Sequence, residues 1–217
     1  MGSTPKLADQ RFSVREARKA DVSAMTDVFF HSFNAPFWQY FLPETPDVRR
    51  WWDQGWALGI DSATDRSFVV EDSEQGDRIV AFSRWMTPQS DGSQVRACWP
   101  EMPEGMDMEV ADAFFSGMEA NRHAMMEKRL HWFLEMLGVH EDYQKHGIGA
   151  TLIKWGTDQA DADGLQTYLD ASEIGWPYYK RRHAFAGERP IAIPDRPQYG
   201  SFTYRSLVRE PQKALAG

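Results

Sequence analysis

The sequence predicts an α+β protein built on one mixed β-sheet, and two observations carry this prediction. Residues 66–72 and 78–87 look like strands, and the short turn between them contains Gly76, which is typical of an antiparallel hairpin. Farther along, residues 131–172 follow a strand–helix–strand pattern, which implies a parallel crossover. A sheet that contains both kinds of pairing is mixed, and we expect helices to flank it.

The remaining elements follow from periodicity and turn residues. The first strand alternates apolar and polar residues, and Asp21 can cap the helix after it. Residues 34–47 are rich in aromatic residues and prolines, and residues 89–104 contain several proline, glycine and serine residues. We therefore expect loops in both segments, with short helical turns possible in the first. The expected strands are 12–17, 66–72, 78–87, 131–139, 166–172, 191–196 and 201–209, and the expected helices are 22–33, 47–59, 107–128 (as one helix or two), 149–163 and 177–183.

The length of 217 residues suits one domain with a sizeable core. We expect this domain to span residues 11–210, with a helical insertion at about 89–128. Residues 1–10 are expected to form a flexible N-terminal arm, and residues 211–217 a C-terminal tail.

Composition narrows the class of protein and its partners. The formal net charge of −8 argues against a nucleic-acid partner and weakly favours a cationic substrate. The single cysteine, Cys98, allows no internal disulfide and no cysteine zinc cluster, so we expect a reducing, cytoplasmic setting. No apolar run approaches about 18 residues, so we expect no membrane span. The six histidines lack metal-binding spacing, and no metal is assigned.

A glycine-containing turn carries the strongest chemical signal. An apolar strand ends at Val139, a polar turn follows, and a helical pattern begins at or near Gly147 and Gly149. The first N–H groups of a helix lack internal partners and carry partial positive charge, so this turn can bind a pyrophosphate. The Walker pattern is absent, and the dinucleotide fingerprint fails because Leu152 stands where its third glycine belongs.

The spacing Gln-x-x-Gly-x-Gly at residues 144–149 resembles the acetyl-CoA motif of the GCN5-related N-acetyltransferase (GNAT) superfamily. Residues 132–185 resemble the family's central block, whereas 34–59 and 89–128 match it poorly. The resemblance implies a GNAT-like fold, in which a mostly antiparallel sheet contains a central, splayed pair of parallel strands. The chain is most similar to the small-molecule acetyltransferase branch, which implies acetyl-CoA as the cofactor and CoA as the product.

The resemblance also implies a cofactor site along the gap between the parallel strands. One strand would pair its backbone with the pantetheine arm, as in the addition of a strand to an edge. Ser172 would either hydrogen-bond the arm or cap a helix. The implied residues are Leu137, Gly138 and Val139 for the arm, and Gln144, Lys145, His146, Gly147, Ile148, Gly149 and Ala150 for the pyrophosphate.

The implied reaction is direct attack by an amine, which needs a base to take a proton. Strand alternation places Glu135 on one face with Phe133 and Leu137, where burial would make its carboxylate a better base. The alternative is a carboxylate that reaches solvent or pairs with an arginine or lysine. Relatives without a carboxylate at this place exist in the family.

The departing thiolate needs a proton, which the family often supplies from a tyrosine on the helix after the second parallel strand. Tyr179 is the candidate here, with ordinary packing as the alternative. Tyr178 points about 100° away on the same helix, so the two cannot both face the sulfur. The familiar ending Tyr-x-x-x-Gly-Phe is altered, because Ala184 precedes Phe185 and Tyr179 lies one residue too far upstream.

Aromatic residues after the first helix are candidates for the acceptor site. In the family this region forms an acceptor wall, and Phe37, Trp38 and Tyr40 would suit an apolar or aromatic amine through cation–π contact. A hydrophobic cluster under a loop is the equal alternative. Trp51 and Trp52 are expected to be core residues.

The sequence therefore predicts an enzyme, an N-acetyltransferase that transfers an acetyl group from acetyl-CoA to a primary amine of a small molecule. Two alternatives stay open. One is a protein or peptide N-acetyltransferase, which would need an open acceptor groove. The other is a non-catalytic acyl-CoA sensor, which would keep the 144–149 turn without turnover.

Overall fold

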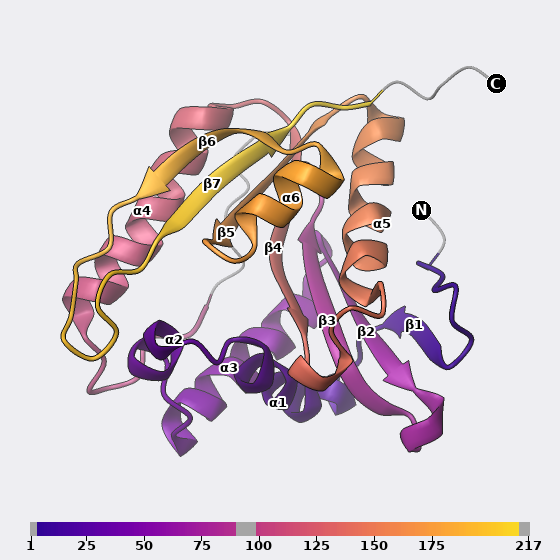
Figure 1. Ribbon diagram of the computed structural model, residues 1–217, viewed down its shortest axis with the longest axis horizontal. Coiled ribbons are helices and arrows are strands. Elements are labelled where there is room, and N and C mark those ends of the chain that lie inside the picture. The colour runs from indigo at the N-terminus through magenta and orange to yellow at the C-terminus, as the bar shows by residue number, and fades with distance from the viewer. Residues whose placement is uncertain (1–3, 90–98, 213–217) are drawn as a thin grey trace.

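The computed structural model describes residues 4–89 and 99–212, so Cys98 and the outermost residues of the predicted arm and tail lie outside it. One seven-stranded sheet has the order β1-β2-β3-β4-β5-β7-β6 (Figure 1). β4 and β5 are parallel and the other neighbours antiparallel, as predicted. The strands are β1 (Phe12–Glu16), β2 (Asp65–Asp72), β3 (Arg78–Met86), β4 (His131–Val139), β5 (Gln166–Ser172), β6 (Ala186–Ile191) and β7 (Tyr204–Arg209).

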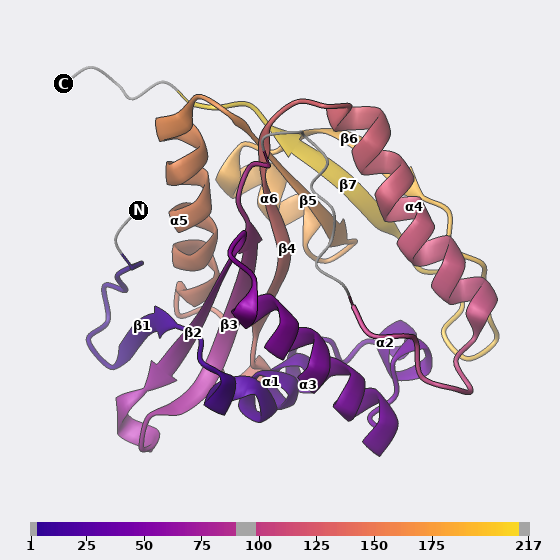
Figure 2. The same cartoon turned by 180° about the vertical axis from the view of Figure 1, so that it is seen from behind.

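Helices cover both faces of the sheet, and each face carries its own hydrophobic core. α5 and α6 pack on one face, and α1, α3 and α4 pack on the other (Figures 1 and 2). None of the described helices combines the length and apolar character that a membrane crossing requires. The helices are α1 (Val22–Ser32), α2 (Pro36–Phe41), α3 (Pro46–Asp61), α4 (Met108–Met126), α5 (Ile148–Asp163) and α6 (Trp176–His183).

The two parallel strands pair over a short distance and then separate. Their last pair is Leu134 opposite Leu169. Beyond it, β4 stays beside β3 as far as Val139, while β5 stays beside β7 as far as Ser172. Figure 1 shows the two halves of the sheet diverging from this point. The central parallel pair is therefore splayed, as the family resemblance of the sequence implies.

A β-bulge in β4 changes which side chains face which helices. The register of β3 against β4 shifts by one residue and leaves Glu135 as the extra residue of β4. Leu134 and Leu137 therefore both pack on the α5 side, although strict alternation would place them on opposite faces. The prediction that Phe133, Glu135 and Leu137 share one face is wrong for this reason.

Two segments outside the central block differ from, or refine, the sequence prediction. The strand expected at 191–196 is wrong, because the observed strand is β6, at Ala186–Ile191. β6 lies at the edge of the sheet, where Pro190 is tolerated because an edge residue need not donate a ladder hydrogen bond. Residues 34–46 contain α2, one of the short helical turns expected there.

The C-terminal end of α6 explains the altered family ending. Ala184 adopts a left-handed conformation (φ 57°), the conformation that normally selects glycine. The N–H groups of Ala184 and Phe185 both donate to the carbonyl oxygen of Tyr179, which satisfies a carbonyl of the last turns of the helix. Alanine therefore takes the geometry of the familiar glycine at some conformational cost.

We predict that Ala184→Gly raises the free energy of unfolding by about 1 kcal/mol, because glycine adopts a positive φ without a Cβ clash. Urea denaturation measures the change. The matched control is Ala120→Gly at an exposed site inside α4, which should lose about 1 kcal/mol through helix propensity. A loss of stability in both variants would contradict the assignment of strain to Ala184.

Candidate active site

A cavity of about 1000 Å³ opens where β4 and β5 separate. Its lining comes from both faces of the sheet, and we name the two parts by what lines them. The turn side is lined by Leu137, Gly138, Val139, Gln144, Lys145, Gly147, Ile148, Gly149, Ala150, Ala171, Ser172, Gly175, Tyr178, Tyr179 and Arg181. The aromatic side is lined by Phe29, Phe33, Phe37, Trp38, Trp51, Trp52, Trp99, Phe114, Phe115, Tyr199, Phe202 and Tyr204.

The turn before α5 lies at this cavity, and a run of its backbone amides has no acceptor in the part of the chain that the structure describes. Among the described residues, no group accepts a hydrogen bond from the backbone N–H groups of residues 145–150. Lys145 and Gly147 adopt positive φ values of 69° and 78°. Residues with positive φ next to residues with negative φ are typical of backbone nests, in which successive N–H groups can bind an anion, and this turn lies at the positive end of α5.

The residues around the turn explain why it holds this shape. The Gln144 side chain donates a long hydrogen bond of 3.4 Å to the carbonyl oxygen of Val139. Tyr143, at the end of a short 3-10 turn, is buried in the core beneath α5. A Cβ on Gly147 would meet no atom within 4 Å, so its positive φ, not crowding, is the feature that favours glycine there.

The structure brings most of the predicted cofactor residues to the cavity. All of them line it except His146, whose ring instead packs against Phe12 at 5.7 Å between centroids. Ser172 lines the cavity, and its hydroxyl also accepts a 3.4 Å hydrogen bond from the N–H of Gly175. Both roles that the sequence left open for Ser172 are therefore compatible with its position.

Gly138 is fixed by packing on the other face of β4. A Cβ at this position would lie 2.7 Å from the Phe82 ring and 3.1 Å from the Ser32 hydroxyl. Gly149 is less constrained, since its nearest neighbours would be in ordinary contact at 3.6 Å or more. Gly138 thus lets α1 approach β4 closely, and Gly149 leaves the first turn of α5 without a side chain.

The two tyrosines of α6 have different surroundings. Tyr179 is half-buried and packs edge-on against Phe185, with ring centroids 5.7 Å apart. Burial raises the pKa of the Tyr179 hydroxyl above its ordinary value, so it stays protonated and can donate. Tyr178 also lines the cavity but is 37% exposed. The geometry favours Tyr179 as the hydroxyl in a low-dielectric position.

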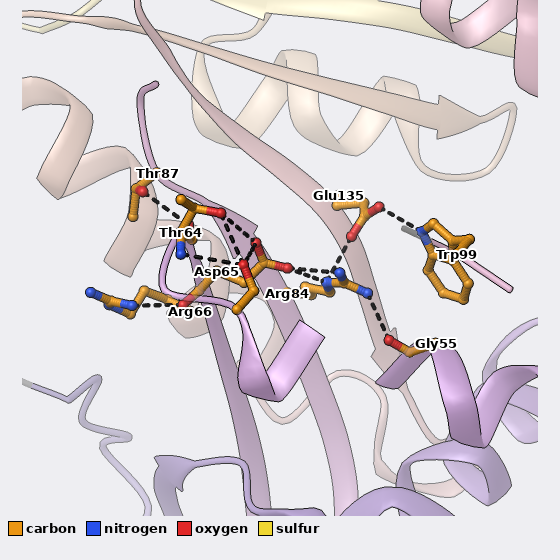
Figure 3. A network of polar contacts seen from close by, with 9 residues as sticks. Gly55, Thr64, Asp65, Arg66, Arg84, Thr87, Trp99 and Glu135 are labelled. Atoms are coloured by element: carbon orange, nitrogen blue, oxygen red, sulfur yellow. Dashed lines mark hydrogen bonds and ion pairs between the residues drawn. The ribbon is translucent and has the colours of Figure 1, made fainter. Parts of the chain in front are cut away.

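Glu135 belongs to a buried ion cluster with Arg84 and Asp65 (Figure 3). The guanidinium Nη2 lies 2.7 Å from the Asp65 carboxylate, and Nε lies 2.9 Å from Glu135 Oε2. Trp99 donates its indole N–H to Glu135 Oε1 at 3.2 Å, and Arg84 Nη1 donates to the carbonyl oxygen of Gly55 at 3.3 Å. All three charged side chains are at most 1% exposed.

This arrangement limits how Glu135 could act. Its carboxylate pairs with an arginine, as one of the two interpretations has it. Its side chain is fully buried, so it has no exposed oxygen to offer an amine directly. The nearby guanidinium favours the ionised carboxylate, which is the form that a base requires. A catalytic role for Glu135 therefore needs a water molecule between its carboxylate and the amine.

Two glycines one helical turn apart make room for this cluster. Gly55 and Gly59 lie on the face of α3 that meets the sheet. A Cβ at Gly55 would lie 2.1 Å from the Trp99 ring, and one at Gly59 would lie 2.4 Å from Cζ of Arg84. Neither position tolerates a side chain while the cluster keeps this geometry.

The predicted acceptor residues divide between the cavity and other contacts. Phe37 and Trp38 line the aromatic side, but both are buried, and Phe37 stacks on Phe202 at 3.8 Å. Tyr40 is absent from the lining, and its hydroxyl donates instead to Asp107 at 2.7 Å. Tyr40 is therefore not brought to the site.

Several lining residues were missed by sequence reasoning. Trp51 and Trp52, expected only in the core, are buried and also line the cavity. Trp99 lies in a proline-rich segment with no periodicity that could have marked it. Asp170 is the one charged residue of its strand, QTYLDAS, and that charge was the available signal. In the part of the chain that the structure describes, no group of His, Cys, Asp and Glu residues could hold a metal.

We predict that Arg84→Met lowers the free energy of unfolding by about 3–5 kcal/mol, because it leaves two buried carboxylates without their shared cation. Urea denaturation measures the change. The matched control is Lys154→Met, which breaks an exposed pair with Asp158 and should cost less than about 1 kcal/mol. Equal, small losses of unfolding free energy in the two variants would show that the ion cluster does not stabilise the fold.

Comparison with known proteins gives a family for this fold and cavity. A family model described as the acetyltransferase (GNAT) family matches residues 26–185. The fold is similar to that of an agmatine N-acetyltransferase variant, with a TM-score of 0.64 and 12% identity over 93% of this chain and 100% of that chain.

Two further solved structures are similar at comparable levels. The protein described as histone acetyltransferase HPA2 and related acetyltransferase, from Corynebacterium glutamicum, has a TM-score of 0.55 and 19% identity over 95% of this chain and 100% of that one. An N-acetyltransferase from Staphylococcus aureus has a TM-score of 0.54 and 14% identity over 92% and 98%. Identities this low establish a shared fold alone.

Because the family model covers well over half of the sequence, the protein belongs to the GNAT acetyltransferase family.

Proposed function

We propose that the protein is an N-acetyltransferase that transfers an acetyl group from acetyl-CoA to a primary amine of a small molecule. The observation that carries the proposal is the run of backbone amides at residues 145–150, which have no acceptor among the described residues and which, His146 apart, belong to residues that line the cavity. An anion with several oxygens, such as a diphosphate, matches this row of donors. A cytoplasmic setting, expected from the single cysteine, is part of the same proposal.

The chain would hold the cofactor with backbone groups more than with side chains. The amides of residues 145–150 would bind the diphosphate, and the edge of β4 at Leu137–Val139 would pair with the pantetheine arm. Lys145 and Arg181 line the turn side and add positive charge near the phosphates. When bound, acetyl-CoA supplies an activated acetyl group as a thioester.

Two side chains would move protons. We propose Glu135, acting through a water molecule, as the group that accepts the proton of the amine. We propose Tyr179 as the donor to the sulfur of the leaving thiolate, since burial keeps its hydroxyl protonated. The amine nitrogen forms a bond to the acetyl carbon as the carbon–sulfur bond breaks. The amine nitrogen loses one proton to Glu135 through the water molecule, and the thiolate gains one proton from Tyr179.

The aromatic lining of the cavity favours a small-molecule acceptor over a protein. The aromatic side is lined by large side chains from α1 to α4 and from the segment before β7. Such walls fit a compact amine better than an extended peptide. The similar structures include enzymes named for agmatine and for histone, so they do not separate the two classes. A non-catalytic acyl-CoA sensor would bind with the same amides and show no turnover.

We predict that acetyl-CoA and CoA raise the melting temperature of the protein, whereas NAD does not. A ligand at 100 times its Kd should stabilise the fold by about 2.7 kcal/mol.

Gly147→Ala should weaken CoA binding at least tenfold, because it strains the positive φ in the turn before α5. The matched control is Gly164→Ala, which strains a positive φ at the other end of α5 and should leave CoA binding unchanged. Equal affinity in both variants would remove the turn from the proposal.

We predict that Tyr179→Phe lowers kcat at least tenfold and leaves KM for acetyl-CoA nearly unchanged, because the hydroxyl acts on the leaving group. Tyr178→Phe is the matched control on the same helix and should retain full activity. Glu135→Gln should also lower kcat, with a flattened dependence of the rate on pH. Thiol release in the presence of an amine library measures all three. Unchanged turnover in Tyr179→Phe and Glu135→Gln would contradict both assignments.

A further inference from the structure

Trp99 connects the aromatic side of the cavity to the buried ion cluster. Its indole N–H donates to Oε1 of Glu135 at 3.2 Å, and both residues line the cavity. The other carboxylate oxygen, Oε2, lies 2.9 Å from Nε of Arg84. The two donors come from different parts of the chain, and Figure 3 shows them approaching Glu135 from different sides. Together they hold the carboxylate in one orientation.

Packing fixes the Trp99 ring on several sides. The ring stacks on Trp51 at 4.8 Å between centroids and meets Trp52 edge-on at 5.2 Å. The Arg84 guanidinium lies over the ring, 5.3 Å from its centroid. The edge of the six-membered ring occupies the space that Gly55 leaves, because a Cβ there would lie 2.1 Å from Cζ3. A ring held in this way keeps its N–H in one direction, so Trp99 is a rigid donor.

We propose that Trp99 is a positioning residue for acetyl transfer, and that its indole N–H orients the Glu135 carboxylate that takes the proton of the amine. The assignment rests on the proposed function, because Glu135 acts as a base only if the protein transfers an acetyl group. Arg84 and Asp65 place opposite charges in the cluster, whereas Trp99 adds direction without charge. Direction matters because a base must lie within hydrogen-bond reach of its proton, directly or through one water molecule.

A double-mutant cycle on kcat tests this role, with thiol release in the presence of an amine as the assay. Trp99→Phe keeps an aromatic ring but removes the N–H, so it should lower kcat at least tenfold and leave KM for acetyl-CoA nearly unchanged. In the Glu135→Gln background the same substitution should change kcat less than about twofold, because the carboxylate that Trp99 orients is already absent. An equal loss of kcat in both backgrounds is the result of a merely structural role and would overturn the assignment.

The matched control removes the same kind of hydrogen bond elsewhere on β4. The indole N–H of Trp132 donates to the Asp163 carboxylate at 2.8 Å, and Trp132 does not line the cavity. Trp132→Phe should leave kcat within about twofold of the wild-type value. A loss of kcat as large as that in Trp99→Phe would assign the effect to core packing and would overturn the proposal.

NMR of the nine tryptophan indole N–H groups, labelled with ¹⁵N, detects the hydrogen bond in the free protein without turnover. Trp99→Phe identifies the Trp99 signal by its loss. Glu135→Gln should move that signal upfield, because a neutral amide accepts a weaker hydrogen bond than a carboxylate does. A signal that stays in place would overturn the Trp99 assignment alone. A signal that moves, in a protein that acetylates no amine, would refute the acetyl-transfer proposal and the positioning role with it.

Discussion

The separation of β4 from β5 is the constraint on which the rest of the structure depends. Each strand keeps its outer neighbour, but beyond Leu134 and Leu169 neither is paired with the other. Backbone groups inside a protein need partners, so an edge of this kind suits a ligand that supplies them. The turn before α5, the tyrosines of α6 and the aromatic side of the cavity all surround this one opening.

The bulge at Glu135 changes which side chains of β4 pack on each face of the sheet. It reverses the alternation of β4, so that Leu137 and Val139 face α5 and the turn. It also brings the Glu135 carboxylate to Arg84, whose guanidinium is shared with Asp65 on its other side. A buried charge is tolerated only when it is paired and hydrogen-bonded, which explains the joint contribution of α3, β2 and β3 to the cluster.

The sequence predicted what depends on local pattern and missed what depends on tertiary contact. The hairpin, the parallel crossover and the turn before α5 each have short-range signals, and the structure contains all three. The bulge has no such signal, because it arises from the register between two strands, and the predicted face of Glu135 was therefore wrong. His146 and Tyr40 carry suitable chemistry, but neighbouring contacts turn both away from the cavity.

The same reasoning explains the glycines and the aromatic residues. Glycine is normally unfavourable inside a helix. Gly55 and Gly59 are explained only by tertiary contacts, because a Cβ at these positions would collide with Trp99 or Arg84. Trp51 and Trp52 fit a core interpretation, which is correct but incomplete, since a cavity wall is itself part of the core. Composition showed that aromatic residues were abundant, and tertiary structure alone shows which of them share a cavity.

The central claim is that backbone amides around the turn bind a diphosphate. Residue-resolved amide hydrogen exchange tests it most directly, because it reports on the N–H groups themselves. On addition of CoA, exchange should slow at residues 145–150 and along the edge of β4 at Leu137–Val139, while the exposed β2–β3 turn stays unchanged. Unaltered exchange at residues 145–150 under saturating CoA would contradict the account.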